Sequence, residues 1–344
     1  MDNIRQQVLK LLRQHQDSIN EEELEVAPAS WPGVSGAYHV AAPSSSYSVL
    51  QNADHNTKGM TLINQAVPGL CPSIIREDNE NLNVLVENLK EYKSFEEQLT
   101  ESHVDSTATI RLVEGLSALH SHKHTGQDLK QQFRSQKDAV NSALFTHPFD
   151  SGLPEADDLP EKLQSAVSSL QQDRRVTSAL QTLKEVHQDN SECLIHGSLS
   201  PATVMVKDSS VKLVGCAFVH AGPAALDVGC LLGHHILWYH QHMLTRIDND
   251  AHRRVSYALL RVATDSARLY CDARGLTGER LATFMKHAAG FAACEIIRRV
   301  LEPACRLSLS ARCESIGSAV RLLHAYHRIT SIDQLLNVAL MLTQ

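Results

Sequence analysis

The feature that most limits the possible folds is a change of hydrophobic pattern near residue 90. Before it, residues 33–88 contain short segments rich in Val, Tyr and Leu, separated by Pro, Ser, Asn and Gly: GAYHVAA, YSVLQ, MTLINQAV and LNVLVENL. Such segments are typical of an antiparallel sheet. After it, apolar residues recur at helical spacing, as at Ile110, Val113, Leu116 and Leu119. The pattern predicts an α+β chain with a small β lobe followed by a large helical lobe.

The same pattern divides the chain into three parts. Residues 1–28 are expected to contain an N-terminal helix that runs to about residue 25 and ends before Pro28. Residues 29–90 are expected to form the small β-containing lobe, and residues 91–344 the helical lobe. An extended linker is expected between them, from Glu87 to Tyr92.

Charge and composition exclude several classes of partner. The 344 residues carry a formal charge of −7, and Lys and Arg are scattered rather than clustered, so no nucleic-acid partner is expected. There is no run of about 18 apolar residues and no cleavage site after the first helix, so we expect a cytoplasmic protein without a membrane partner. Eight widely spaced Cys residues without a CxxC pair are expected to be buried, reduced thiols.

Three β-like pieces, ECLIHG, ATVMVKD and SVKLVGCAFVHAGP, follow one another within the helical part. The turn after the first, residues 196–203, places His196 two residues before Ser198. Such a pair could serve nucleophilic catalysis, but no third group is identifiable, so a structural histidine is preferred. His235 and His242 would share one helical face, but no acid or Cys completes a ligand set, so no metal is expected.

The stretch LIHGSLSPATVMVKDSSVKLVGCAFVHAGPAALDVGCLLGHHILW resembles the catalytic core of the aminoglycoside phosphotransferase and choline kinase-like group, and within it the 5-methylthioribose kinase family. The segments LINQAVP, LFTHPF and GFAACEIIRRV resemble other parts of that family, in the same order along the chain. The resemblance covers about residues 30–344. It implies a two-lobed protein-kinase-like fold, here with a reduced N-lobe, with nucleotide between the lobes, and it allows a homodimer.

The matching positions lack the residues that phosphoryl transfer needs in that family. The resemblance places the phosphate-binding lysine at Asn64, the catalytic base at Ser198, and two metal-binding acids at Gly215 and Ala217. The helix that brings an acid to the lysine is expected to be deleted, because little sequence separates QAVPGL from CPSII. These groups act as one unit in phosphoryl transfer. Their joint loss predicts a pseudokinase that uses no cofactor.

Other matching positions keep residues that would shape a pocket. Gly197 and Asp227 are expected to preserve and brace the 196–203 loop. A small sugar-like molecule, or another small ligand, is expected to contact His196, Ser198, Cys216, His220, Arg298 and Arg299. For the two arginines, an inter-helix salt bridge is an equal alternative.

Three kinds of function stay open on these residues. The first is a binding or interaction module without phosphotransfer. The second is an enzyme with redirected, non-kinase chemistry in the inherited cleft, and the third is a divergent but active sugar kinase.

Overall fold

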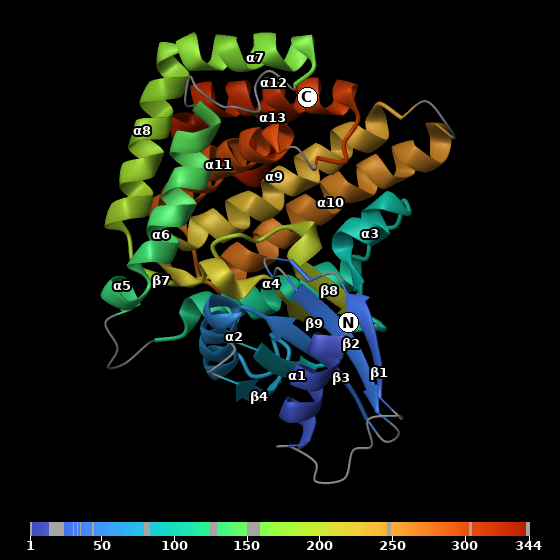
Figure 1. Ribbon diagram of the computed structural model, residues 1–344. Coiled ribbons are helices and arrows are strands. Elements are labelled where there is room, and N and C mark those ends of the chain that lie inside the picture. Colours follow the sequence, from blue (N-terminus) through green and yellow to red (C-terminus); the bar gives the residue numbers. More distant parts are fainter. Residues whose placement is uncertain are drawn as a thin grey trace.

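The protein has a small sheet-based lobe and a larger helical lobe (Figure 1). The computed structural model describes residues 2–13, 24–29, 31–32, 34, 36–42, 45–78, 83–123, 129–149, 159–245, 249–302 and 305–341. An antiparallel sheet comes first along the chain and a largely helical region follows it. The predicted two-lobed α+β class is therefore confirmed.

The small lobe is built on a five-stranded antiparallel sheet with strand order β1-β2-β3-β5-β4. The strands are β1 (Glu25–Ala29), β2 (Gly36–Ala42), β3 (Ser45–Gln51), β4 (Ile74–Asp78) and β5 (Asn83–Glu87). Helix α1 (Asp2–Arg13) buries Val8, Leu9, Leu11 and Leu12 in one cluster with sheet residues such as Val40, Val49 and Leu85. The lobe thus has an apolar core of its own on the α1 side of the sheet.

The predicted N-terminal helix is described over Asp2–Arg13, and it does not run to residue 25, because residues 25–29 form strand β1 with Pro28 inside the strand. A proline cannot donate to a strand ladder, and β1 lies at the edge of the sheet, where proline is tolerated. The predicted helix over residues 14–23 lies outside the described residues.

The sequence MTLINQAV is helical, and its prediction as a strand was wrong. It lies in α2 (Asp54–Ala66), between β3 and β4, so the helix that was expected to be deleted from this lobe is present. Short apolar runs do not distinguish a strand from a buried helix, and here Met60 and Ile63 face the core at helical spacing. Asn64 therefore lies on a helix. Its side-chain nitrogen donates a hydrogen bond to the Pro72 carbonyl, and its side-chain oxygen accepts one from the Cys71 backbone nitrogen, both in the turn that follows.

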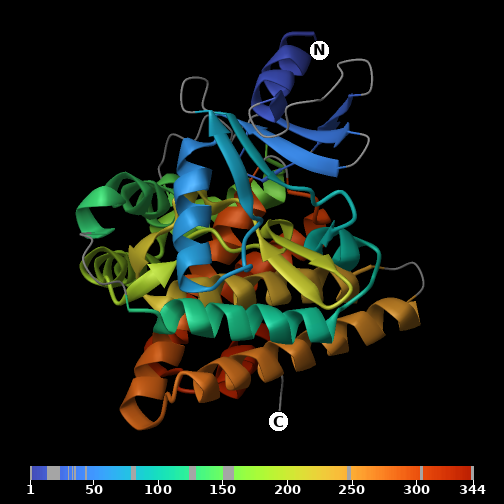
Figure 2. The same ribbon diagram turned by 90° about the horizontal axis from the view of Figure 1, so that it is seen from below.

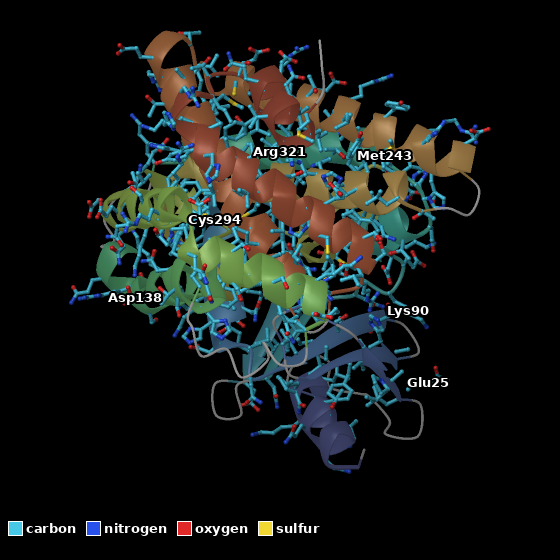
Figure 3. All side chains as sticks on the ribbon, turned by 90° about the horizontal axis from the view of Figure 1, so that it is seen from above. Glu25, Lys90, Asp138, Met243, Cys294 and Arg321 are labelled. Carbon is cyan, nitrogen blue, oxygen red and sulfur yellow. The ribbon has the colours of Figure 1, made fainter. Side chains whose placement is uncertain are left out.

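After Glu87 the chain leaves the sheet and enters the helical lobe through β6 (Lys93–Ser94), which pairs with β8 (Val204–Lys207). Lys90, in the connecting segment, lies at the boundary between the lobes (Figure 3). Helix α3 (Phe95–Thr100) follows directly, and then α4 (Ser106–Ser121). Ile110, predicted to face the core of α4, is 44% exposed, and Leu112 is buried instead.

The helical lobe is arranged around α9 (Ala224–Met243), which is buried along nearly its whole length and packs against α10, α11 and α12 (Figures 1 and 2). No helix in the described part of the chain is long and apolar enough to cross a membrane. The remaining helices are α5 (Leu129–Gln132), α6 (Arg134–Asn141), α7 (Glu161–Gln172), α8 (Arg174–Asp189), α10 (Asn249–Ala273), α11 (Gly278–Leu301), α12 (Leu309–Ala325) and α13 (Ile332–Leu340).

The β-like pieces predicted within the helical part form two small sheets. Strands β7 (Cys193–Ile195) and β10 (His220–Gly222) pair with each other, and β9 (Ser210–Leu213) joins β8 and β6. Single-turn helices occur at Ser142–Thr146, His147–Phe149, Pro201–Thr203, Cys216–Phe218 and Tyr326–Arg328. The 196–203 loop is therefore held between two strand pairs.

Helix α2 approaches the helical lobe so closely that only glycine fits at one position. A Cβ atom added at Gly59 would lie 2.1 Å from the Cys216 carbonyl oxygen. We expect Gly59→Ala to lower the free energy of unfolding by about 1–3 kcal/mol, although alanine is the better helix former. Urea unfolding with an unchanged m value would measure this loss.

Gly317→Ala in α12 is the matched control. Its added Cβ would meet only the end of the flexible Arg321 side chain, at 3.2 Å from Nη1. We expect this variant to be neutral or slightly stabilised. Equal effects of the two substitutions would contradict the close approach of α2.

Candidate functional site

The 196–203 loop is held by one buried carboxylate. Asp227, in the first turn of α9, accepts a hydrogen bond from the His196 backbone at 2.7 Å and from the Gly197 backbone at 2.9 Å. Its Oδ2 also accepts from His120 Nε2 at 3.1 Å. Burial alone would raise the pKa of Asp227, but these bonds, that of His120 foremost, hold it below its usual value. The carboxylate fixes the backbone of the turn.

The side chains of His196 and Ser198 lie in different surroundings on this loop. His196 is fully buried, and its Nε2 donates to the Val214 carbonyl at 3.0 Å. Ser198 lines a cavity of about 60 Å³ together with Leu144, Glu295 and Arg298. That volume has room for a few water molecules. The structure gives the two side chains separate contacts rather than joining them as a nucleophile and its base.

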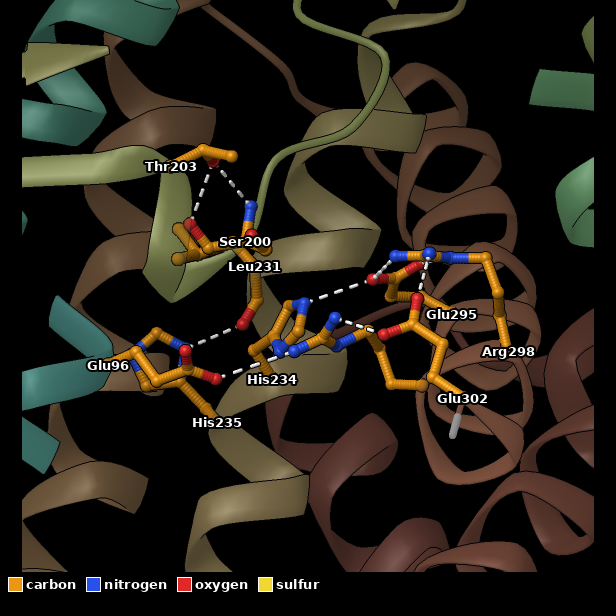
Figure 4. A network of polar contacts seen from close by, with 10 residues as sticks. Glu96, Ser200, Thr203, Leu231, His234, His235, Glu295, Arg298 and Glu302 are labelled. Atoms are coloured by element: carbon orange, nitrogen blue, oxygen red, sulfur yellow. Dashed lines mark hydrogen bonds and ion pairs between the residues drawn. The ribbon is translucent and has the colours of Figure 1, made fainter. Parts of the chain in front are cut away.

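Arg298 is occupied by a carboxylate that the sequence analysis missed. Its guanidinium donates from Nε and Nη2 to Glu295, at 2.7 and 2.6 Å, while His234 Nε2 donates to the same carboxylate at 3.0 Å (Figure 4). Glu302 accepts from both Arg298 and Arg299, and Arg299 also reaches Glu96 of α3 at 3.4 Å. Arg299 thus joins α11 to α3 through an ion pair, whereas Arg298 pairs within α11 and its C-terminal cap and also lines the Ser198 cavity.

Glu295 is almost completely buried, with 2% of its surface exposed. Burial alone would raise its pKa, but the charge of Arg298, with the hydrogen bonds from His234 and Arg298, lowers the pKa of Glu295 to about 2. Burial lowers the pKa of His234 to about 4. One sequence signal could have pointed to this residue, because Glu295 is the single charge in the apolar run FAACEII.

The positions matched to metal-binding acids follow β9 directly. Gly215 has a left-handed backbone with φ of 72°, and Cys216 begins a single helical turn. The Sγ atom of Cys216 lies 3.6 Å from that of Cys71, which follows α2. Together with Ala217 and Asn64, these positions offer no carboxylate and no cation. Within the described ranges, no group of three or more His, Cys, Asp or Glu side chains is placed to hold a metal ion.

His220 belongs to a second cavity on the other side of α6. Its Nδ1 donates to the Phe218 carbonyl at 2.7 Å, and its Nε2 lies 2.9 Å from Nε2 of His187. Burial lowers the pKa of His220 to about 4. The cavity has a volume of about 440 Å³, and its lining includes Arg134, Lys137 and Asn141. Of the six residues predicted to contact a ligand, His220 is the one that lines this larger space.

Comparisons with known proteins relate this chain to methylthioribose kinases. The chain is 24% identical over 254 residues to the methylthioribose kinase of Bacillus velezensis, which is 68% of this chain and 62% of that relative. It is 26% identical over 196 residues to the methylthioribose kinase of Cronobacter sakazakii, which is 53% of this chain and 49% of that relative. The matched part thus spans between about half and two thirds of these relatives' own lengths. The chain is a distant homologue of the methylthioribose kinases.

The sequence identity to solved structures is lower. The apo form of a thermostable mutant of the aminoglycoside phosphotransferase APH(4)-Ia has 13% identity and a TM-score of 0.49, covering 93% of this chain and 98% of that one. A choline kinase from Streptococcus pneumoniae has 12% identity and a TM-score of 0.42, covering 93% of this chain and 100% of that one. No family model matches the sequence.

The ionised state of Glu295 predicts a pH dependence of stability. Because the folded-state pKa is depressed from 4.5 to about 2, the contribution of Glu295 is complete above the unfolded-state pKa and is lost as the pH falls toward 2. Between pH 5 and pH 3, this loss should reach about 2 kcal/mol. In Glu295→Gln, which is less stable at pH 7, the unfolding free energy should fall less steeply over that range.

Chemical denaturation at a series of pH values would measure both slopes. Glu185→Gln, on an exposed position of α8, controls for the removal of one carboxylate. Parallel curves for the wild type and Glu295→Gln would contradict an ionised Glu295 held by Arg298.

Proposed function

We propose that this protein is a pseudokinase: a homologue of methylthioribose kinases that does not transfer phosphate from ATP and that serves as an interaction module. The observation that carries the proposal is the segment Val214–Phe218, in which Gly215, Cys216 and Ala217 stand where the resemblance implies metal-binding acids. Phosphoryl transfer depends on Mg²⁺ held by carboxylates and on a lysine near the phosphates. Without these groups the developing charge has nothing to stabilise it.

The packing around this segment supports the same proposal. The Cys216 carbonyl lies directly against Gly59 of α2, which leaves no room for a cation or a phosphate between them. A Cβ atom added at Gly215 would lie 2.9 Å from Cγ2 of Thr203. The backbone there is also left-handed, a conformation that disfavours any residue with a side chain. The packing and the backbone of this segment therefore disfavour an acidic side chain at residue 215.

The space beside Ser198 favours an interaction module over a sugar-binding one at the inherited position. Ligand pockets are typically about 300–1,000 Å³ in volume, whereas the Ser198 cavity measures about 60 Å³. The guanidinium of Arg298 already has a bidentate carboxylate partner in Glu295, so it is not available to hydroxyl groups of a ligand. Glu295, Arg298 and His234 bond one another at this site.

The proposal predicts no response to nucleotide. Purified protein should show no Mg²⁺-dependent thermal shift with ATP and no formation of ADP with 5-methylthioribose, because no group holds the metal or the phosphates. A methylthioribose kinase assayed in parallel serves as the positive control. A Mg²⁺-dependent shift accompanied by turnover would overturn the proposal.

Restoring two acids should not restore activity. Ser198→Asp combined with Gly215→Asp should remain inactive, and its stability should fall by about 1–3 kcal/mol because of strain at residue 215. Ser198→Asp alone is the matched control and should keep a stability closer to that of the wild type. Phosphotransfer by the double variant would show that packing of α2 does not block the site.

A second candidate function is binding of a small polar molecule in the cavity beside His220. Its volume of about 440 Å³ suits a small ligand, and Lys137 and Arg134 on its lining bring cationic groups. With 5-methylthioribose as the probe at millimolar concentration, we expect a melting-temperature rise of about 2 °C. Lys137→Ala should abolish the rise, and Lys184→Ala on α8 should retain it. No rise in the wild type would exclude this sugar as the ligand of this cavity.

A further inference from the structure

Two cysteines from different lobes meet beneath the 196–203 loop. Cys71 follows α2 in the small lobe, Cys216 follows β9 in the helical lobe, and 145 positions separate them in the sequence. Their Sγ atoms are 3.6 Å apart, and both residues are fully buried. The sulfur atoms of a disulfide are about 2.05 Å apart, so a modest movement of the two side chains would join them.

The backbone on both sides keeps the two cysteines together. Leu213 donates a backbone hydrogen bond to the Leu70 carbonyl at 2.7 Å, directly beside Cys71. The side chain of Asn64 accepts from the Cys71 nitrogen at 3.0 Å. Because these bonds fix both segments, the closeness of the thiols is a property of the joint between the lobes.

The imidazole of His196 is anchored two residues before Cys216, on the Val214 carbonyl. Its Nε2 donates to the Val214 carbonyl, which makes Nδ1 the acceptor nitrogen of the neutral ring. That Nδ1 is buried and has no hydrogen-bond partner within the described part of the chain. A hydrogen bond from Cys71 contributes most to lowering the pKa of Cys216, and His196 lowers it further. Burial, in contrast, raises the pKa of Cys71, which keeps its proton.

We propose that Cys71 and Cys216 form an oxidation site, at which a peroxide converts the two thiols into a disulfide that links the two lobes. In the first step, Cys216 passes its proton to His196 and its thiolate attacks a peroxide oxygen. The S–O bond forms, the O–O bond breaks, and the departing oxygen leaves as water with the proton from His196. Cys71 then attacks the sulfenic sulfur, so that the S–S bond forms and a second water leaves with the Cys71 proton. The two sulfurs lose two electrons, which the peroxide oxygens gain.

This inference does not rest on the proposed loss of phosphotransfer. It uses Cys216 and His196 for a different chemistry from that of a kinase. Because both thiols are buried, the oxidant reaches them only when the joint opens transiently, so the reaction is slower than oxidation of an exposed thiol. Cys305 and Cys313 are partly exposed and would react first. They are therefore replaced in the test protein.

The test uses the full chain with Cys305→Ser and Cys313→Ser, treated with hydrogen peroxide and then alkylated. Peptide mass spectrometry without reduction should find one linked pair, Cys71 with Cys216, that dithiothreitol reverses. The linked protein should melt about 5 °C or more above the reduced protein, because the cross-link closes a long loop. Cys71→Ser and Cys71→Ala should each lose the link, and Cys271→Ser, at another buried thiol, should keep it.

A separate variant tests the role of His196 as a positioning residue and base. His196→Gln should slow disulfide formation about tenfold at pH 7 and shift the pH profile of the rate upward, because Cys216 then ionises at higher pH. Recovery of only sulfinic Cys216, or of no linked peptide while the protein stays folded, would overturn the proposal. An unchanged pH profile in His196→Gln would overturn the role of His196.

Discussion

The carboxylate of Asp227 is the interaction on which the central loop depends. A fully buried charge is costly unless it is hydrogen-bonded, and here two consecutive backbone N–H groups and His120 donate to the carboxylate. The bonds come from backbone, so the turn keeps its shape whatever side chain stands at position 198. The shape of the loop therefore does not depend on the side chain at position 198. This independence explains how a serine can occupy a turn that elsewhere presents an acid.

Around this loop, protein groups contact one another at positions where a kinase would bind its substrates. Glu295 faces Arg298, Cys71 faces Cys216, and the carbonyl of Cys216 faces the backbone of α2. Glu295 and Arg298 lie one turn apart on α11, whereas the two contacts of Cys216 join the lobes. Opening the site for a ligand would break these tertiary contacts and a buried ion pair whose separation is expensive.

The sequence predicted the large divisions because they rest on local pattern. The change near residue 90 and the strands around His196 follow from propensity and periodicity. Helix α2 was missed because both sides of MTLINQAV are partly apolar, which hides the helical period. The partners of Arg299 and Cys71 were beyond reach, since Glu96 and Cys216 are 203 and 145 positions away and only the assembled fold brings them near.

The joint between the lobes has a mechanical consequence. The Leu213–Leu70 hydrogen bond adds a second backbone link between the lobes to the connection through residues 88–92. With these attachments at separate points, relative rotation of the lobes is stiff about any axis that does not pass through both, since such a rotation must stretch at least one of them.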